Sequence, residues 1–399
     1  MSKQVVFHYG QDVLTPGRAL ALARGTMSGE ISGESRRRVE ACTAHVERMA
    51  RGDLPVYGVN TGFGPLCTTR ISAEDTRTLQ KNILMSHSSG MGEPIDPFLS
   101  RLMLVLKVHA LSKGHSGIRL ETLDRLLWHL DQNIIPVVPC QGSVGASGDL
   151  APLSHLFLPL LGLGHVWDQG QARPALQILL AKGKKPLDLG PKEGLALING
   201  TQFMASHGVW ALERLHDLLD LADMAGALSL EALAGSVKPF GSELHDLRPH
   251  PGVRYVAGRL RTLLKDSGMV KAHEHCGKVQ DPYSLRCMPQ IHGASRQVWA
   301  HLNQVLSTEI NGVTDNPVIL DSGEAISGGH FHGQPIALPL DFAAMGASEL
   351  GNVADRRIYL LLLGNDQGLP RLLLPKTGLQ SGFMIPQYTS AALTTENKT

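Results

Sequence analysis

The sequence predicts a mainly α-helical protein with a loop-rich N-terminal region and a central bundle of long helices. Leucines recur at helical spacing over residues 203–232, and similar patterns cover 290–311 and 341–363. The alternation that marks strands is scarce, and glycine and proline interrupt the first half of the chain. We therefore expect an N-terminal region, 1–200, that carries the chemistry and a helical bundle over 201–399.

Shorter helices are expected in the N-terminal region. Apolar periodicity predicts them at 35–51, 99–112 and 121–132. Glycines and prolines cluster at 55–65 and 90–97, where we expect loops. The later patterns are long and rich in alanine and glycine, which let neighbouring helices approach closely, so a bundle is the expected architecture.

The composition excludes several classes of protein. The 399 residues are 43% hydrophobic and 18% charged, which is typical of a globular chain with one large core or two to three smaller ones. A net charge of +1 argues against nucleic acid or a membrane surface as the partner. The five cysteines form no C-x-x-C motif, and the first residues contain no apolar signal segment. We expect a cytoplasmic protein that binds a small molecule or further copies of itself.

One stretch carries unusual chemistry. Residues 142–155 read GSVGASGDLAPLSH. If the backbone nitrogen of Gly148 bonds to the carbonyl carbon of Ala146, a five-membered ring closes. Loss of one water from the ring and a second from the Ser147 hydroxyl leaves an electrophilic 4-methylidene-imidazol-5-one. Glycine is the least hindered nitrogen for this attack, and the flanking Gly145 permits the turn.

Other interpretations of this tripeptide remain open from its letters alone. It could be a glycine-rich turn before a helix that starts near Pro152. A serine hydrolase elbow needs G-x-S-x-G, but Asp149 stands where the last glycine would be. A phosphate-binding loop needs a G-K-[ST] ending, which the stretch lacks.

The longer string resembles the signature of the aromatic amino acid ammonia-lyases, a family that includes histidine and phenylalanine ammonia-lyases. Further stretches resemble the family's other motifs in the same order, so the resemblance covers nearly the whole chain. They are VYGVNTGFGPL (56–66), LALINGTQFM (195–204), VQDPYSLRCMPQIHGA (279–294), GGHFHGQPIA (328–337) and LTTENK (393–398).

The resemblance implies elimination of ammonia from an α-amino acid to give a trans α,β-unsaturated acid. It implies that Ala146, Ser147 and Gly148 form the 4-methylidene-imidazol-5-one group, with no metal or external cofactor. Tyr57 is the implied base for the β-proton, a role that general base catalysis allows a tyrosine. Asn199 is implied to steady the prosthetic group and the substrate carboxylate.

A second block is implied to bind the substrate. Arg286 would hold the carboxylate through a bidentate fork. Gln280 is an implied substrate ligand and Tyr283 an implied catalytic residue of the same block. Tyr283 and Arg286 are spaced i, i+3, so a helical turn would put them on one face. Phe331 is implied to pack on the prosthetic ring or the substrate.

Two positions indicate the histidine branch of the family. Ser86 and His87 form the pair that is typical of that branch, and Glu396 stands where that branch has a glutamate. A carboxylate can accept a hydrogen bond from an imidazole, which a phenyl ring cannot donate. We expect L-histidine as substrate and trans-urocanate as product. The alternatives are a phenylalanine or tyrosine lyase, an aminomutase of the family, or an inactive helical scaffold.

The resemblance also implies a homotetramer whose active sites are shared between protomers. Family members run on for roughly a further hundred residues, so we expect a chain that is cut short at the C-terminus, with Glu396 near its end.

Histidines and a cysteine form two groups that look like metal ligands. No further group completes a known spacing, so we expect a protein without a metal site. The residues concerned are His273, His275, Cys276, His330 and His332.

Overall fold

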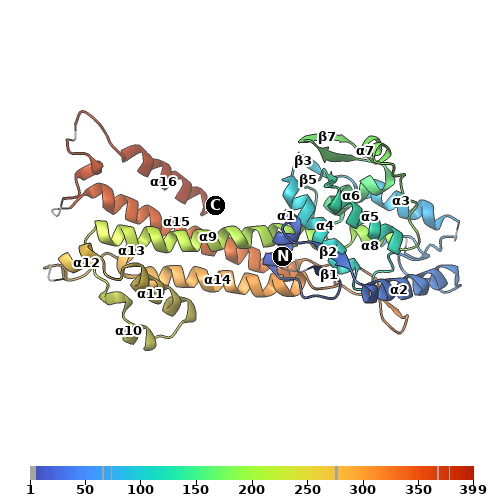
Figure 1. The fold of residues 1–399 in the computed structure, drawn as a ribbon, viewed down its shortest axis with the longest axis horizontal. Helices are drawn as coiled ribbons and strands as arrows, with labels where there is room; N and C mark the ends of the chain where they lie inside the picture. The colour runs from blue at the N-terminus through green and yellow to red at the C-terminus, as the bar shows by residue number, and fades with distance from the viewer. Residues whose placement is uncertain (1–5, 65–66, 73, 275–276, 366–367, 377) are drawn as a thin grey trace, which may run out of the picture. The chain divides into compact units, whose positions relative to one another are not determined.

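The computed structural model describes residues 6–64, 67–72, 74–274, 277–365, 368–376 and 378–399. The chain forms two compact units. The first unit comprises Met1–Trp210 and Val305–Ala337, and the second comprises Ala211–Gln304 and Leu338–Thr399. Figure 1 shows that short helices and small sheets make up the first unit, whereas long helices dominate the second. The mainly α fold predicted from the sequence is confirmed.

Eight helices that the structure describes lie in the first unit and surround its core. Their order is α1 (Pro16–Arg24), α2 (Gly33–Arg51), α3 (Thr76–His87), α4 (Pro97–Leu111), α5 (Leu120–Asp131), α6 (Leu150–Phe157), α7 (Ala175–Ala181) and α8 (Glu193–Ile198). The three helices predicted in this region are present as α2, α4 and α5, each with ends within two residues of the prediction.

The central helix of the first unit is α4. Asp96 caps its first turn by accepting a hydrogen bond from the backbone N–H of Phe98 at 2.8 Å, and Pro97 occupies the position where a helix tolerates proline. Almost every later side chain is apolar and buried, and α4 packs against α1 and α5. The exceptions to this apolar pattern include one lysine, Lys107, which is 1% exposed.

The described strands are short and form small sheets of two or three strands. A parallel pair forms from β1 (Phe7–Tyr9) and β2 (Gly29–Ile31), and antiparallel pairs form from β3 (Met91–Pro94) with β5 (Pro139–Gln141) and from β8 (Val318–Ile319) with β9 (Ala325–Ile326). A three-stranded sheet has the order β4 (Ile135–Pro136), β6 (His165–Asp168), β7 (Gln171–Pro174). Each strand has only two to four residues, which is too short for an alternating pattern to be recognised in the sequence.

Long helices follow where the sequence predicts them. They are α9 (Gln202–Ala232), α14 (Met288–Glu309) and α15 (Gln334–Leu363). Helix α15 begins seven residues before the predicted start. The prediction starts late because Pro335 and Pro339 lie in the first turns of the helix, and proline usually indicates a break. Pro335 is the second residue of the helix, where its missing N–H would have no partner within the helix, whereas Pro339 lies inside the helix, which continues through both.

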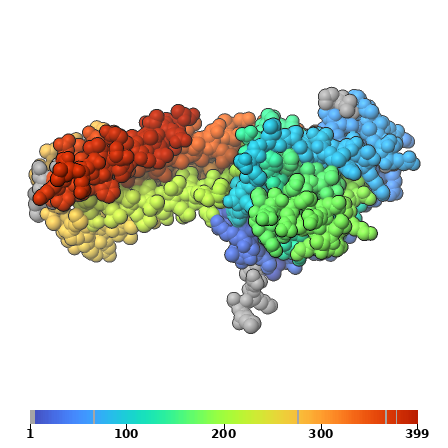
Figure 2. Space-filling model, turned by 90° about the horizontal axis from the view of Figure 1, so that it is seen from above, coloured from blue at the N-terminus to red at the C-terminus, as the bar shows by residue number. Residues whose placement is uncertain are grey.

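Shorter helices complete the second unit. They are α10 (Ser242–Asp246), α11 (Pro251–Leu263), α12 (Gly268–Ala272), α13 (Tyr283–Arg286) and α16 (Met384–Glu396). Figure 2 shows α16 in red on the surface of this unit, and no residue between Met384 and Glu396 is buried.

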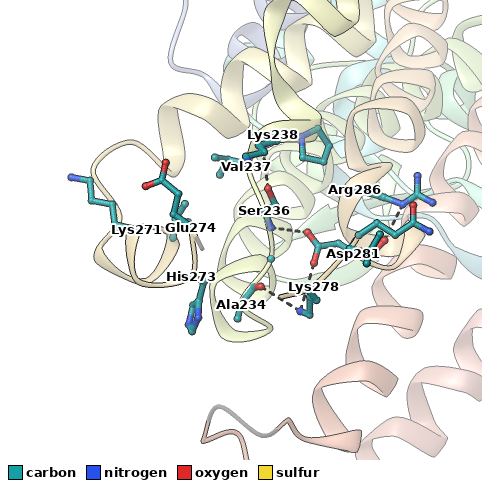
Figure 3. Close-up of a pocket in the computed structure, with 15 residues that line it drawn as sticks. Ala234, Ser236, Val237, Lys238, Lys271, His273, Glu274, Lys278, Asp281 and Arg286 are labelled. Carbon is teal, nitrogen blue, oxygen red and sulfur yellow. Dashed lines mark hydrogen bonds and ion pairs between the residues drawn. The ribbon is translucent and has the colours of Figure 1, made fainter. Parts of the chain in front are cut away.

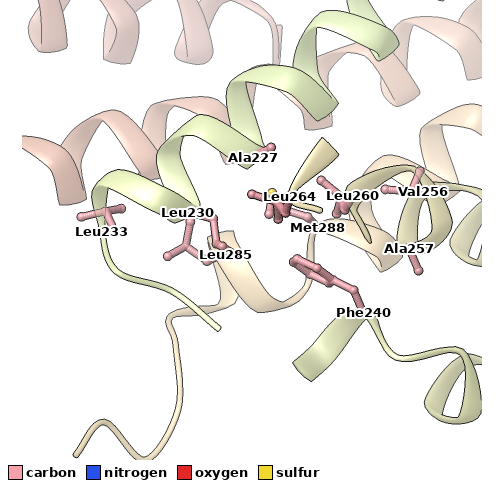
Figure 4. Packing of buried hydrophobic residues seen from close by; sticks show 10 residues of the cluster. All are labelled: Ala227, Leu230, Leu233, Phe240, Val256, Ala257, Leu260, Leu264, Leu285 and Met288. Atoms are coloured by element: carbon pink, nitrogen blue, oxygen red, sulfur yellow. The ribbon is translucent and has the colours of Figure 1, made fainter. Parts of the chain in front are cut away.

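An apolar cluster holds α9, α11 and α14 of the second unit together (Figure 4). Gly252 of α11 and Gly293 of α14 meet so closely that a Cβ atom on Gly252 would lie 2.1 Å from the carbonyl oxygen of Gly293. Small residues thus bring these helices together. The cluster consists of Ala227, Leu230, Leu233, Phe240, Val256, Ala257, Leu260, Leu264, Leu285 and Met288.

No described helix is both long and apolar enough to cross a bilayer. Three 3-10 turns have both of their ends among the described residues. The turns are η2 (Leu158–Leu161), η3 (Lys238–Phe240) and η4 (Arg371–Leu373). The predicted division of the chain at residue 200 stays a prediction.

Candidate active site

The Ala-Ser-Gly tripeptide lies at the meeting point of three helix ends in the first unit. Helices α3, α6 and α8 pack against one another. His87 is the last residue of α3, Asp149 immediately precedes α6, and Asn199 immediately follows α8. Packing of the three helices therefore gathers residues that are far apart in the sequence around residues 142–149.

The tripeptide itself is folded into a tight turn. Isolated β-bridges pair Gly145 with Gly148 and Ala146 with Gly148. Gly145 and Gly148 have φ angles of +76° and +81°, in the left-handed region that favours glycine. The turn therefore brings together the two residues whose carbonyl carbon and nitrogen would join in the five-membered ring.

The segment that follows α8, Asn199 and Gly200, contacts this turn. A Cβ atom on Gly148 would lie 2.8 Å from the carbonyl oxygen of Gly200, so only glycine fits without a shift of the backbone. The backbone N–H of Asp149 donates to the same oxygen at 2.7 Å. The side-chain Nδ2 of Asn199 donates to the carbonyl oxygen of Ser147 at 2.9 Å. The structure thus brings Asn199 into contact with the tripeptide, and its role in the reaction stays a prediction.

Asp149 ties both sides of the turn together. Its Oδ1 accepts a hydrogen bond from the Ser143 hydroxyl at 2.7 Å, and its Oδ2 accepts one from the backbone N–H of Met204 at 3.0 Å. Burial raises the pKa of this carboxyl to about 6, and these hydrogen bonds oppose the rise. The sequence alone does not reveal these contacts, because Met204 lies 55 positions from Asp149 along the chain.

The opposite side of the turn faces a cavity of about 400 Å³. Ser86 and His87 line it together with all three residues of the tripeptide. The Ser86 hydroxyl lies 3.0 Å from Nδ1 of His87. The structure therefore brings the predicted specificity residue His87 to the predicted reactive residue Ser147.

His155 holds the loop that follows His87. Its Nε2 accepts a hydrogen bond from the backbone N–H of Gly90 at 3.0 Å, and burial lowers its pKa. A neutral ring with an unprotonated Nε2 suits this contact. Sequence reasoning missed His155, although a histidine inside the apolar segment 155–161 was a signal that it has a partner.

The segment that carries Phe331 also contacts the turn. The backbone N–H of Gly333 donates to the carbonyl oxygen of Gly145 at 2.9 Å, and the Met204 side chain packs beside both glycines. Phe331 is half-buried. The contact thus involves Gly333, two residues after Phe331, and the role of Phe331 stays a prediction.

Tyr57 lines a different cavity of the first unit, of about 550 Å³, which shares no lining residue with the one beside Ser147. Its hydroxyl accepts a hydrogen bond from the backbone N–H of Gly64 at 3.3 Å, and the ring meets Phe63 edge-on. The structure shows no contact between Tyr57 and the tripeptide among the described residues, so the role of Tyr57 as base stays a prediction.

The second unit carries the predicted carboxylate-binding block (Figure 3). The predicted helical turn is present as α13, and the Arg286 guanidinium carbon lies 4.5 Å from the centre of the Tyr283 ring. Nε of Arg286 donates to the carbonyl oxygen of Asp281 at 2.9 Å. Arg286 and Gln280 line a cavity of about 500 Å³. An arginine anchored through Nε keeps its terminal fork for a carboxylate.

Asp281 fixes the loop that precedes α13. Its carboxylate accepts a hydrogen bond from the backbone N–H of Ser236 at 2.6 Å and lies 3.6 Å from Nζ of Lys278. Lys278 in turn donates to the carbonyl oxygen of Leu233 at 2.8 Å, just beyond the end of α9. These contacts attach the loop with Gln280 to the end of a long helix.

Glu396 ends α16 and is exposed. The structure describes no contact of its side chain with another predicted site residue, so its role in substrate choice stays a prediction.

No three described His, Cys, Asp or Glu side chains come together as ligands for a metal ion. His275 and Cys276 lie outside the described residues. His330 contacts the backbone carbonyl of Val313 at 3.1 Å, and His332 accepts a hydrogen bond from the backbone N–H of Gln334 at 3.2 Å. Local backbone contacts thus account for both histidines.

Comparison with known proteins gives matches to amino acid lyases in both sequence and fold. Residues 14–399 match the aromatic amino acid lyase family. The histidine ammonia-lyase of Myxococcus xanthus is 48% identical over 388 residues, which are 97% of this chain and 76% of that protein. The histidine ammonia-lyase of Deinococcus radiodurans is 48% identical over 92% of this chain and 71% of its own length.

Solved structures of the same kind share the fold. The crystal structure of histidine ammonia-lyase from Trypanosoma cruzi has a TM-score of 0.87 and 41% identity, over 98% of this chain and 74% of that one. The structure of tyrosine aminomutase from Streptomyces globisporus has a TM-score of 0.91 and 34% identity, over 99% of this chain and 78% of that one.

Proposed function

The chain belongs to the aromatic amino acid lyase family, and from this premise we propose that it is a carbon–nitrogen lyase that removes ammonia from L-histidine and releases trans-urocanate. Identity of 46–48% to histidine ammonia-lyases, over at least 92% of this chain, is the observation that carries the choice of substrate. The aminomutase of similar fold is 34% identical. An aminomutase, or a phenylalanine or tyrosine lyase, is therefore the second candidate.

The residues around the tripeptide fit a prosthetic group formed from Ala146, Ser147 and Gly148. Ring closure joins the nitrogen of Gly148 to the carbonyl carbon of Ala146, and two waters leave. The tight turn supports this step, and Asn199 supplies a donor to the Ser147 carbonyl together with a buried Oδ1 that has no partner in the described structure. When formed, a 4-methylidene-imidazol-5-one supplies an electrophilic carbon that draws electrons from the substrate amine.

The chain's own residues would then bind the substrate and move its protons. Arg286 would bind the carboxylate by a bidentate contact, assisted by Gln280 and stacked on Tyr283. Tyr57 would remove the β-proton. A base must reach this proton, which is barely acidic, while the amine is held at the other face of the same bond.

Specificity would come from the imidazole-binding side chains. His87 lines the cavity beside Ser147, and the proposal assigns Glu396 the imidazole N–H. Phe331 would pack on the flat ring of the substrate or of the prosthetic group. A hydrogen-bonding pocket rejects a phenyl ring because its polar groups would be left unpaired.

The proposed enzyme is a homotetramer with shared active sites. Residues with proposed roles are divided between the ranges of the two units, with Arg286 in one and Ser147 in the other. The second unit also exposes large apolar side chains at helical spacing on α9 and α15, as expected of surfaces that other copies cover. They are Leu218, Leu221, Met224, Leu228, Leu338, Phe342 and Met345.

The proposal places the reaction in the cytoplasm. Four cysteines are unpaired thiols in the structure, which fits a reducing compartment. They are Cys42, Cys67, Cys140 and Cys287.

Purified protein should convert L-histidine to urocanate, followed by ultraviolet absorbance and by release of ammonia, without an added cofactor and in the presence of EDTA. Its intact mass should be lower than the sequence mass by two waters, about 36 Da. L-Tyrosine and L-phenylalanine are the comparison substrates. Faster formation of coumarate or cinnamate would favour the second candidate, and an unprocessed mass in an active sample would refute the prosthetic group.

A further inference from the structure

A lysine is buried beneath the tripeptide. Lys107 lies on α4 among fully buried apolar side chains such as Leu106 and Val108, and it is itself 1% exposed. Its Nζ donates a hydrogen bond to the backbone carbonyl oxygen of Asn199 at 2.7 Å. None of the reaction steps described above uses Lys107.

The contact connects the core of the first unit to the reactive turn. Asn199 is the residue after α8, with φ −91° and ψ 129°, so its carbonyl lies outside the helical ladder and needs another donor. Lys107 is that donor. On its other side, Asn199 donates from Nδ2 to the carbonyl oxygen of Ser147 at 2.9 Å. The position of the Asn199 backbone thus sets the position of the amide that touches Ser147.

A lysine is a costly way to fill this space. Removal of an ammonium group from water disfavours its charge, and burial lowers the pKa of Lys107 to about 7. Asp315 and Asp149 favour the charged form, while Lys192 opposes it. An apolar side chain of the same length would pack among the neighbours of α4 without this cost. The bond to Asn199 is what an apolar side chain could not replace.

We propose that Lys107 is a positioning residue that fixes Asn199 beneath Ser147, and that ring closure at Ala146-Ser147-Gly148 and turnover both depend on it. The inference rests on the proposed function for the role of the ring. Its structural content is a connection from Lys107 through Asn199 to Ser147. The alternative is that Lys107 only stabilises the end of α8.

The first unit offers a matched control. Lys192 is also fully buried, and its Nζ donates to the carbonyl oxygen of Ser116 at 2.8 Å and to Oδ2 of Asp315 at 2.7 Å. It makes no hydrogen bond to Asn199 in the described structure. Lys192→Met therefore removes an equally buried ammonium without breaking the connection to Ser147.

The experiment compares the full chain with Lys107→Met, Lys192→Met, Asn199→Ala and the double variant Lys107→Met/Asn199→Ala. Intact mass gives the fraction of each protein that has lost two waters. Thermal unfolding gives stability, and kcat and KM are measured with L-histidine. Because intact mass needs no substrate, a wrong substrate assignment would not obscure the result, and an unprocessed parent chain would refute the proposed function instead.

We expect Lys107→Met to keep the melting temperature of the parent but to process slowly and to lose about 10- to 100-fold in kcat, with a smaller change in KM. Lys192→Met should melt earlier yet process fully. The double variant should lose no more activity than Asn199→Ala alone, because both changes break one connection.

Three results would overturn the proposal. They are parental processing and kcat in Lys107→Met, additive losses in the double variant, and an equal loss of processing in Lys192→Met. If Lys107→Met does not fold, Lys107→Gln replaces it. Its amide is polar, but the side chain is too short to reach Asn199, so the same loss is expected, and parental behaviour would again refute the role.

Discussion

Buried polar groups have different structural roles in the two units of the chain. In the first unit, such groups surround one turn of backbone: Asn199 donates directly to the Ser147 carbonyl oxygen, and Asp149 accepts a hydrogen bond from Ser143, which precedes the tripeptide. In the second, they join helices. His292 contacts Asp223 at 2.7 Å, and Arg357 lies 2.6 Å from the other ring nitrogen of His292. One network supports the turn proposed to form the prosthetic group, and the other joins helices of the bundle.

This difference separates making the reagent from using it. The contacts of the tripeptide given above come from residues of the first unit, so ring formation should depend on those residues. Arg286 belongs to the second unit, where it is half-buried and stacks on the exposed ring of Tyr283. Changes there should alter substrate binding and leave the ring intact. Single substitutions in each unit can test this separation.

Replacement of the reactive serine should have the largest effect. Ser147→Ala removes the hydroxyl that leaves as the second water, so the methylidene carbon cannot form. We expect at least about a 1,000-fold loss of kcat and an intact mass without the loss of two waters. Ser147 is exposed, so the melting temperature should not fall. Activity near that of the parent would show that the reagent lies elsewhere.

Replacement of the carboxylate ligand should affect binding alone. Arg286→Lys keeps a charge but loses the planar fork, and we expect a fall of about 100-fold in kcat/KM, mainly through KM. The intact mass should still show complete ring formation. An unprocessed mass in this variant would contradict the separation of the two units' roles.

Regular parts of the fold could be predicted from the sequence, because periodicity is a local signal. The long helices and α2, α4 and α5 follow it closely. The first two turns of α15 were missed because Pro335 and Pro339 indicate a break, although the helix continues through both prolines. The short sheets were missed as well. Strands such as β4, with two residues, exist only through pairing with distant strands.

The site was predictable where the chemistry is contiguous. The letters of the tripeptide and its flanking glycines predict a turn, and the structure contains one. The contact between Lys107 and Asn199 was not predictable, because the two residues are 92 positions apart and meet only through helix packing. A signal did exist, since a single lysine interrupts the apolar run LMLVLKVHAL. Buried charge in such a run indicates a partner without identifying it.

A change at the specificity position should have an intermediate effect. His87→Leu removes an imidazole that lines the cavity beside Ser147. We expect about a 10-fold fall in kcat/KM for L-histidine and a smaller fall for L-phenylalanine, so the ratio of the two is the measurement. Ser86→Ala, which removes the hydroxyl 3.0 Å from Nδ1 of His87, is the control and should change the ratio less.

The smallest expected effect concerns two buried histidines of the first unit. Burial lowers the pKa of His109 and of His129 to about 4. Nδ1 of His109 accepts a hydrogen bond from the backbone N–H of Gly10 at 3.2 Å, and Nε2 of His129 is buried without a partner in the described structure. A proton on either nitrogen would therefore have nothing to bind.

The sign of the pH dependence follows from these pKa values. Between pH 6.5 and 4 the unfolded chain binds protons at these histidines and the folded chain does not, so stability falls as the pH falls through this range. His129→Asn should lower the melting temperature at pH 7 but flatten its decline toward pH 4 by a few degrees, roughly. His301→Asn, at an exposed position, should leave the slope as in the parent. An identical slope in all three proteins would mean that His129 takes up its proton in the folded state without cost.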